Sequence, residues 1–330
     1  MQINHAGRQS PRYVTRQPVA PSAVKLDLMG NYASPRALTE SEILDLIQRY
    51  ANVARVAQKT GFTGVQIHAA HGYLLSSFLS PITNQRSDAW GGSLANRARF
   101  LLETVRATRA AVGPNYPVAI KLNSDDFRQG GFSHEECLQV VAWLNDLQVD
   151  LLEISGGTYE QPKLLGHTGR SDSIKTETLA VRTSTRQREA YFLEYAAAIR
   201  KVATMPLMVT GGFRSRQAME QALRDGDCDV IGLGRPLCTD PNTVNDLLSG
   251  KIDRVATYEH TLRLAAKGLF SPASPVLPLK LINVIGGQAW YYQQLFRLAD
   301  GLDANPKMGV LRALTAYYSD ELRQAWRIRH

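Results

Sequence analysis

The chain has 330 residues, of which 44% are hydrophobic and 21% are charged. This length and composition exclude wholesale disorder, because such a chain can bury a substantial core. Its 38 Lys and Arg residues outnumber its 30 Asp and Glu residues, which gives a net charge of +8, but the basic residues are scattered. The lack of long basic runs argues against a nucleic-acid-binding protein.

Cysteine usage favours a reducing compartment. The three cysteines are Cys137, Cys228 and Cys238, and the sequence contains no CxxC motif. This pattern argues against a disulfide scaffold, a zinc site or an iron–sulfur cluster, so we expect a cytoplasmic location. No apolar run reaches about 18 residues, and the N-terminus lacks a charged segment followed by an apolar one. We therefore expect neither a membrane span nor a signal peptide.

Amphipathic helices alternate with short apolar strands along the chain. Thr39 and Glu42 form a capping box before residues with helical spacing, and Gly61 marks the end of that helix. A second capping box, Ser133 with Glu136, begins a later helix. Strands are predicted at 1–5, 64–68, 117–122, 149–155, 205–210 and 228–234, and further helices from about 93 to 112 and at 187–203, 216–225, 286–299 and 308–327.

This alternation predicts βαβ units and a parallel sheet, which doubly wound and barrel folds share. The barrel is favoured because no GxGxxG motif opens the first helix, and because glycine turns follow the last two strands. The expected fold is an α/β, TIM (β/α)8-type barrel truncated at its N-terminus to about six βα units, over residues 1–250. A helical C-terminal extension is expected over residues 251–330. Six strands cannot close such a barrel at the usual tilt and shear, so we expect two unpaired edges.

The residues that could carry chemistry gather at one predicted strand end. His68, His71 and Tyr73 lie at or just after the end of the strand at 64–68, on the catalytic face of a barrel. Two imidazoles can hydrogen-bond one substrate oxygen and draw electron density toward it, and a phenol can donate a proton. Ordinary loop histidines and a packed tyrosine are the alternative interpretation. A zinc-dependent hydrolase is less favoured, because no third ligand stands at the usual spacing.

The segment 64–103, GVQIHAAHGYLLSSFLSPITNQRSDAWGGSLANRARFLLE, closely resembles a long signature of the old yellow enzyme family of FMN-dependent ene-reductases. The resemblance covers residues 1 to about 250. It implies that His68 and His71 bind the activating oxygen of the substrate and that Tyr73 is the proton donor. It also implies that the later part of the signature is a scaffold loop, which contains Asn84, Arg86, Asp88, Gly91 and Gly92.

The resemblance further implies FMN as the cofactor and NAD(P)H as the reductant. Gln2 occupies the position of a glutamine that contacts the flavin pyrimidine edge, and Lys121 that of a cation beside flavin N1 and O2. Many relatives have arginine there; lysine supplies the charge without the bidentate fork. The implied phosphate cradle consists of Gly211, Gly212, Gly234 and Arg235. Relatives carry two further βα units before the glutamine strand, so this chain is expected to hold the third to eighth strands.

The sequence thus predicts an FMN-dependent oxidoreductase that uses NAD(P)H to reduce activated alkenes, namely α,β-unsaturated carbonyl or nitro compounds. Flavin would transfer hydride to the β-carbon, and Tyr73 would protonate the α-carbon. The alternative is a truncated, catalytically inactive relative, or a mis-started gene product, with weak or no FMN binding. The expected partner is a small-molecule substrate, with no nucleic acid and no membrane; a homo-oligomer is left open.

Overall fold

The computed structural model describes residues 1–28, 30–157 and 192–329. Its strands are β1 (Gln2–Ile3), β2 (Val19–Ala20), β3 (Arg36–Ala37), β4 (Val65–Ala69), β5 (Val118–Asn123), β6 (Leu151–Ser155), β7 (Leu207–Thr210) and β8 (Val230–Gly232). Its α-helices are α1 (Glu40–Lys59), α2 (Leu74–Leu79), α3 (Leu94–Val112), α4 (His134–Asn145), α6 (Leu193–Ile199), α7 (Arg216–Arg224), α8 (Thr243–Leu248), α9 (Leu277–Ala299) and α10 (Val310–Arg329). Short 3₁₀ helices lie at η1 (Gly7–Gln9) and η3 (Arg235–Cys238).

Six parallel strands form the main sheet, in the order β1-β4-β5-β6-β7-β8, and β2 pairs with β3 separately. Within the main sheet, each strand pairs with the strand of that sheet that follows it in the sequence. This is the strand order of a (β/α) barrel. The predicted strands at 64–68, 117–122 and 149–155 correspond to β4, β5 and β6, with boundaries shifted by one or two residues. Within the described ranges, β1 and β8 are not paired with each other.

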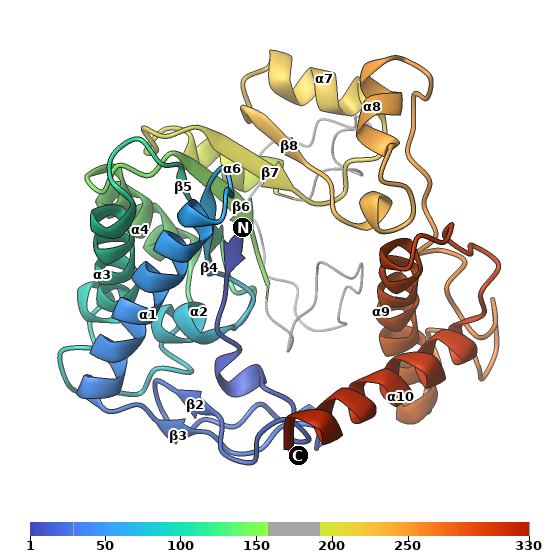
Figure 1. The fold of residues 1–330 in the computed structure, drawn as a ribbon, viewed down its shortest axis with the longest axis horizontal. Helices are drawn as coiled ribbons and strands as arrows, with labels where there is room; N and C mark the ends of the chain where they lie inside the picture. The colour runs from blue at the N-terminus through green and yellow to red at the C-terminus, as the bar shows by residue number, and fades with distance from the viewer. Residues whose placement is uncertain (29, 158–191, 330) are drawn as a thin grey trace. The chain divides into compact units, whose positions relative to one another are not determined.

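The two faces of the sheet differ in chemistry. Ile67, Ile120 and Ile154 are fully buried, and α1, α3 and α4 cover this side of the sheet (Figure 1). The residues that alternate with them point the other way. That opposite side, here called the inner face, carries polar side chains, with His68, Lys121 and Glu153 at matching positions on β4, β5 and β6. The ionisable residues of β4, β5 and β6 therefore lie on one surface.

Side-chain caps mark the start of α1, α3 and α4. The hydroxyl of Thr39 accepts from the backbone N–H of Glu42, and the Glu42 carboxylate accepts from that of Thr39, so the predicted capping box of α1 is confirmed. The same reciprocal pair, Ser133 with Glu136, starts α4. Ser93 caps α3. These caps satisfy backbone donors that have no partner within the first helical turn.

Some elements differ from the prediction. The helix expected at 286–299 begins earlier, at Leu277. Pro278 does not prevent this start, because it lies in the first turn, where a residue has no intrahelical N–H hydrogen bond to lose. Of the helix expected at 187–203, residues 187–191 lie outside the described residues, and α6 occupies Leu193–Ile199. The sequence did not predict α2, α8 or the β2–β3 pair, whose apolar periodicity is too short to detect.

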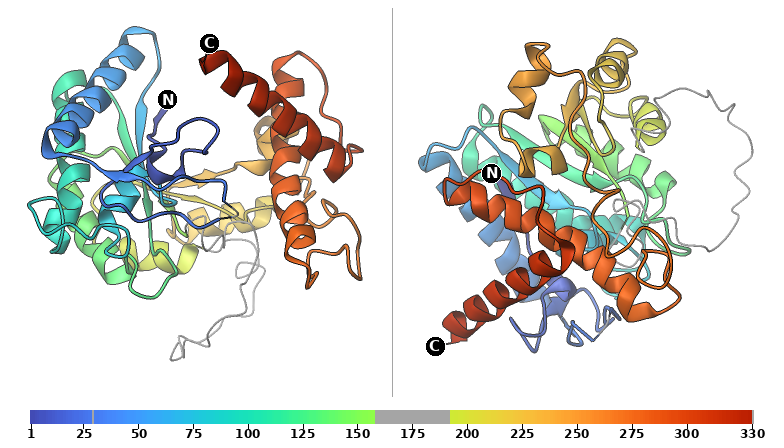
Figure 2. Two further views of the ribbon diagram at one scale, coloured as in Figure 1. Left: turned by 90° about the horizontal axis from the view of Figure 1, so that it is seen from below. Right: turned by 90° about the vertical axis from the view of Figure 1, so that its right-hand side faces the viewer.

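The described residues divide into two compact units. The first lies within Met1–Gly212 and Gln221–Gly232, and the second within Phe213–Glu220 and Leu233–His330. In the second unit, α9 and α10 pack against each other (Figure 2), and the buried Trp290 indole N–H donates to the Met308 carbonyl at 3.0 Å. In the part of the chain that is described, no helix has the length and apolarity needed to cross a membrane.

Candidate active site

The end of β4 brings three predicted residues together. The ring centroids of His68 and His71 lie 5.2 Å apart, and those of His68 and Tyr73 lie 5.0 Å apart, both in edge-to-face arrangements. Two successive left-handed residues, His71 (φ 61°) and Gly72 (φ 78°), turn the chain from β4 into α2. Glycine adopts this conformation without strain, but histidine does so at a cost, so other contacts must hold His71 in place.

Three polar side chains hold His71. Its backbone N–H donates to Asn123 Oδ1 at 3.1 Å, and its carbonyl accepts from Gln9 Nε2 at 2.7 Å. Its ring Nε2 lies 2.6 Å from Ser155 Oγ. The amide of Asn123 is in turn held by the buried Asp126 at 3.0 Å. The N-terminal segment, β5 and β6 therefore fix the backbone and the ring of one residue.

Both imidazoles are neutral at physiological pH. Burial lowers the pKa of His68 to about 4, and the charge of Lys121 acts in the same direction. Burial, Lys121 and His68 hold the pKa of His71 well below its ordinary value. The backbone N–H of Ala70 donates to Nδ1 of His68 at 3.1 Å. Neutral His68 therefore carries its proton on Nε2, the tautomer that leaves this nitrogen as a hydrogen-bond donor.

A polar network crosses four strands of the inner face. The Lys121 ammonium donates to Glu153 Oε1 at 2.7 Å, and Gln66 Nε2 donates to Glu153 Oε2 at 2.7 Å. Gln2 Nε2 donates to Gln66 Oε1 at 2.6 Å. Burial alone raises the pKa of Glu153, but the charge of Lys121 and these hydrogen bonds outweigh it, so the pKa lies below its ordinary value. The structure thus pairs Lys121 with an ionised carboxylate of the protein.

The predicted phosphate-cradle residues fall in both units. Gly211 (φ 134°) and Gly212 (φ 87°) follow β7 in the first unit. Gly234 and Arg235 open η3 in the second unit, where Arg235 pairs with Glu259 at 2.9 Å. At Gly234, φ is −108°, and an added Cβ would meet no atom of the described residues within 4 Å. Neither strain nor packing against those residues therefore requires glycine at this position.

The loop before α3 is held by its own hydrogen bonds. Asn84 Nδ2 donates to the carbonyls of Phe78 and Trp90, both at 2.8 Å. Arg86 pairs with Asp88 and donates to the Leu38 carbonyl. These contacts agree with the scaffold role that the resemblance implied for this part of the signature.

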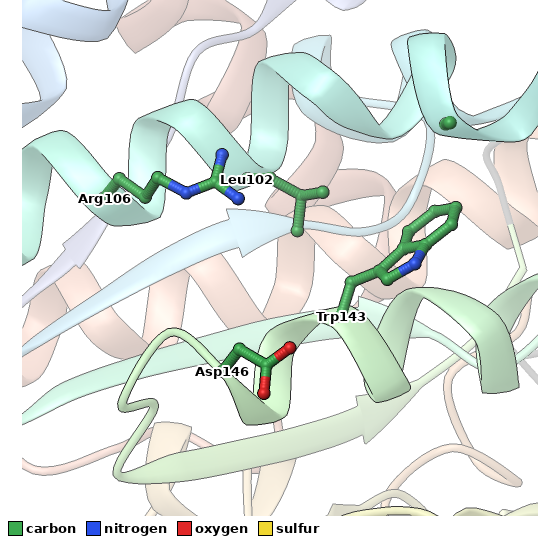
Figure 3. A pocket seen from close by; sticks show the side chains of 5 residues that line it. Leu102, Arg106, Trp143 and Asp146 are labelled. Carbon is green, nitrogen blue, oxygen red and sulfur yellow. The ribbon is translucent and has the colours of Figure 1, made fainter.

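A surface cavity of about 260 Å³ lies away from these residues, between α3 and α4 (Figure 3). Leu102 and Arg106 line it from α3, and Trp143 and Asp146 from α4 and its C-terminal end. It opens on the helical layer rather than on the inner face. Within the described residues, no three His, Cys, Asp or Glu side chains are grouped so that they could hold a metal ion.

Four residues at this site were not assigned from the sequence. Asn123, Ser155 and Glu153 lie on β5 and β6, and Gln66 on β4. A usable signal was present, because each of these strands carries polar residues two positions apart in an otherwise apolar run. The pairs are Gln66 with His68, Lys121 with Asn123, and Glu153 with Ser155. Period-two spacing puts both members of each pair on one face.

Comparison with known proteins identifies the family. Residues 1–253 match the model of the NADH:flavin oxidoreductase / NADH oxidase family. Over 318 residues the chain is 35% identical to the NADH-dependent flavin oxidoreductase iccE of Talaromyces variabilis, which covers 91% of this chain and 74% of that protein. The chain belongs to the NADH:flavin oxidoreductase / NADH oxidase family. The predicted family, the oxidoreductase class, and FMN with NAD(P)H as the family's cofactors are confirmed.

Solved structures confirm the barrel class of the fold. An old yellow enzyme homologue from Zymomonas mobilis matches with a TM-score of 0.60 at 29% identity, over 78% of this chain and 68% of that chain. A 2-naphthoyl-CoA reductase in complex with 2-naphthoyl-CoA matches with a TM-score of 0.65 at 30% identity, over 75% of this chain. The chain spans 37% of that reductase. The relatives are therefore similar over most of this chain but differ widely in their own lengths.

Proposed function

We propose that this chain is an FMN-dependent oxidoreductase that uses NAD(P)H to reduce activated alkenes, α,β-unsaturated carbonyl or nitro compounds, with Tyr73 as the proton donor. The observation that carries the proposal is the cluster of His68, His71 and Tyr73, in which the His68 ring lies 5.2 Å from the His71 ring and 5.0 Å from the Tyr73 ring. Lys121, whose side chain is only 14% exposed, lies opposite His68 on the neighbouring strand. This combination offers hydrogen-bond donors, a proton source and a fixed positive charge on one face.

The residues present fit a bound flavin mononucleotide. Lys121 and Gln2 supply N–H groups on the inner face, which suit the carbonyl oxygens of a flavin pyrimidine ring. Within the first unit, we assign the phosphate to the backbone N–H groups of Gly211 and Gly212 after β7, because glycine has no Cβ to hinder the approach of an anion. Bound FMN would supply the hydride that it takes from NAD(P)H.

The two histidines hold and polarise the substrate oxygen. His68 offers its Nε2–H, because Ala70 occupies Nδ1. In this proposal Ser155 donates to Nε2 of His71, which leaves the His71 proton on Nδ1. Neutral imidazoles donate hydrogen bonds without placing a full charge beside the substrate, and their low pKa keeps them neutral. Tyr73, at the start of α2 and against the His68 ring, donates its phenolic proton to the α-carbon.

Reconstitution with FMN tests the proposal. The purified chain is mixed with FMN, separated from free flavin, and its visible spectrum is recorded before and after NADH or NADPH and then 2-cyclohexenone are added without oxygen. We expect a bound flavin spectrum that the nicotinamide bleaches and the enone restores, with cyclohexanone as the product. A colourless chain that retains no FMN would instead support the inactive relative considered above.

A further inference from the structure

The strongest unassigned feature is the carboxylate of Glu153. It lies directly across from Lys121 in the β5–β6 register, and the two side chains are only 6% and 14% exposed. Each carboxylate oxygen has its own donor, Lys121 on Oε1 and Gln66 on Oε2. Gln66 reaches Glu153 over Ala119, which is the small residue opposite Gln66 on the intervening strand β5. Donors from β4 and β5 therefore orient the carboxylate.

Placing this ion pair on a largely buried sheet face costs desolvation free energy. The free-energy cost of desolvating two charges often exceeds the gain from their mutual attraction. Well-packed apolar residues of similar size can stabilise a fold equally well. The network instead leaves Lys121 fixed beside His68, with its charge balanced by an ionised carboxylate. With both histidines neutral, Lys121 and Glu153 are the charged residues of β4, β5 and β6.

We propose that Glu153 is a positioning residue that holds the Lys121 ammonium in place and sets how much positive charge a bound flavin meets. The inference rests on the proposed function, because it assigns Lys121 to the flavin. A nearby positive charge stabilises an anionic reduced flavin and raises its midpoint potential. Glu153 opposes that effect, so it keeps the flavin a stronger reductant than Lys121 alone would allow.

Three variants separate this charge effect from a structural one: Glu153→Gln, Lys121→Met, and the two combined. The midpoint potential of bound FMN is measured for each by spectroelectrochemical titration. Glu153→Gln is expected to raise the potential and Lys121→Met to lower it, each changing the reduced-to-oxidised ratio about tenfold, or ~30 mV for a two-electron couple. The combined variant should return close to the parent value. Single variants that shift the potential in the same direction, or a Glu153→Gln variant with no shift, would overturn the proposal.

A matched control uses another ion pair of the first unit. Glu136 pairs with the buried Arg97 between α3 and α4, away from the inner face. Glu136→Gln removes a carboxylate in the same way and should leave the flavin potential unchanged. An equal shift in this control would mean that the Glu153→Gln effect reflects general destabilisation, and the proposal would fail.

A flavin-free readout distinguishes this inference from the proposed function. The titration of the His68 ring is followed by NMR in the chain without FMN. Lys121→Met should raise the pKa of His68 and Glu153→Gln should lower it, because the two charges act on the ring in opposite directions. A chain that binds no FMN would defeat the proposed function, whereas a His68 titration unmoved by both variants would defeat the charge coupling itself.

Discussion

Asn123 Oδ1 accepts the backbone N–H of His71 at 3.1 Å, and this contact joins β5 to a residue in the left-handed region, at φ 61°. A non-glycine residue held there costs of order 1 kcal/mol or more, so its position depends on such contacts. Asn123→Ala should therefore let His71 relax. We expect kcat/KM for enone reduction to fall about tenfold or more, while the chain still folds, as checked by steady-state kinetics and circular dichroism.

The matched control for that prediction is Asn145→Ala. Asn145 also bridges backbone groups, since its side chain donates to the Val202 carbonyl and accepts the Thr204 N–H, but it lies at the end of α4. Its loss should lower stability without changing kcat/KM of the folded enzyme. Equal kinetic effects in the two variants would show that Asn123 acts only on overall stability.

The buried histidines make stability depend on pH. In the folded chain, burial first and the Lys121 charge second lower the pKa of His68 to about 4 from its ordinary value of 6.5. Between these values the unfolded chain binds a proton that the folded chain does not, so stability falls as pH falls. Between about pH 7 and pH 5 we expect His68 to account for about 1–2 kcal/mol of that loss.

Urea unfolding at about pH 7 and about pH 5 measures this effect. The unfolding midpoint of the parent chain should drop at the lower pH, and the drop should be smaller in His68→Asn. A variant that loses as much stability as the parent would show that His68 contributes nothing to the pH dependence.

The scaffold loop before α3 depends on one close approach. An added Cβ at Gly91 would stand 2.4 Å from both the carbonyl oxygen and the Cβ of Arg86. Gly91→Ala should therefore displace Arg86 and destabilise the chain by about 1–3 kcal/mol, the range for overpacked sites. At Gly309 an added Cβ meets no described atom within 4 Å, so Gly309→Ala is the control. Similar thermal unfolding of the two variants would contradict the steric argument.

Local signals in the sequence predicted much of the fold. The capping boxes, the apolar strand runs and the alternation of strands with helices fixed most of the first unit, because each depends on residues close together in the chain. The start of α9 lies nine residues before the predicted one, and Pro278 stands in its first helical turn, where proline is tolerated. Short elements such as α2 and α8 have too few turns to show periodicity.

The site was predictable only where it is contiguous. His68, His71 and Tyr73 come from one turn and carry a family signature. Asn123 and Glu153 reach the same region through strand register, which joins residues that are distant in sequence. The pairing of Lys121 with a protein carboxylate could not be foreseen for the same reason, although a cation at the end of an apolar strand does require a partner.

The central claim is that Tyr73 protonates the alkene and takes no part in flavin reduction. The most direct measurement is stopped-flow kinetics of Tyr73→Phe, which follows flavin bleaching by NADH or NADPH and its reoxidation by 2-cyclohexenone separately. We expect a nearly unchanged rate of bleaching and a reoxidation rate lower by about 10²–10⁴, the usual effect of losing a general acid. Reoxidation of the variant at the parent rate would contradict the assignment.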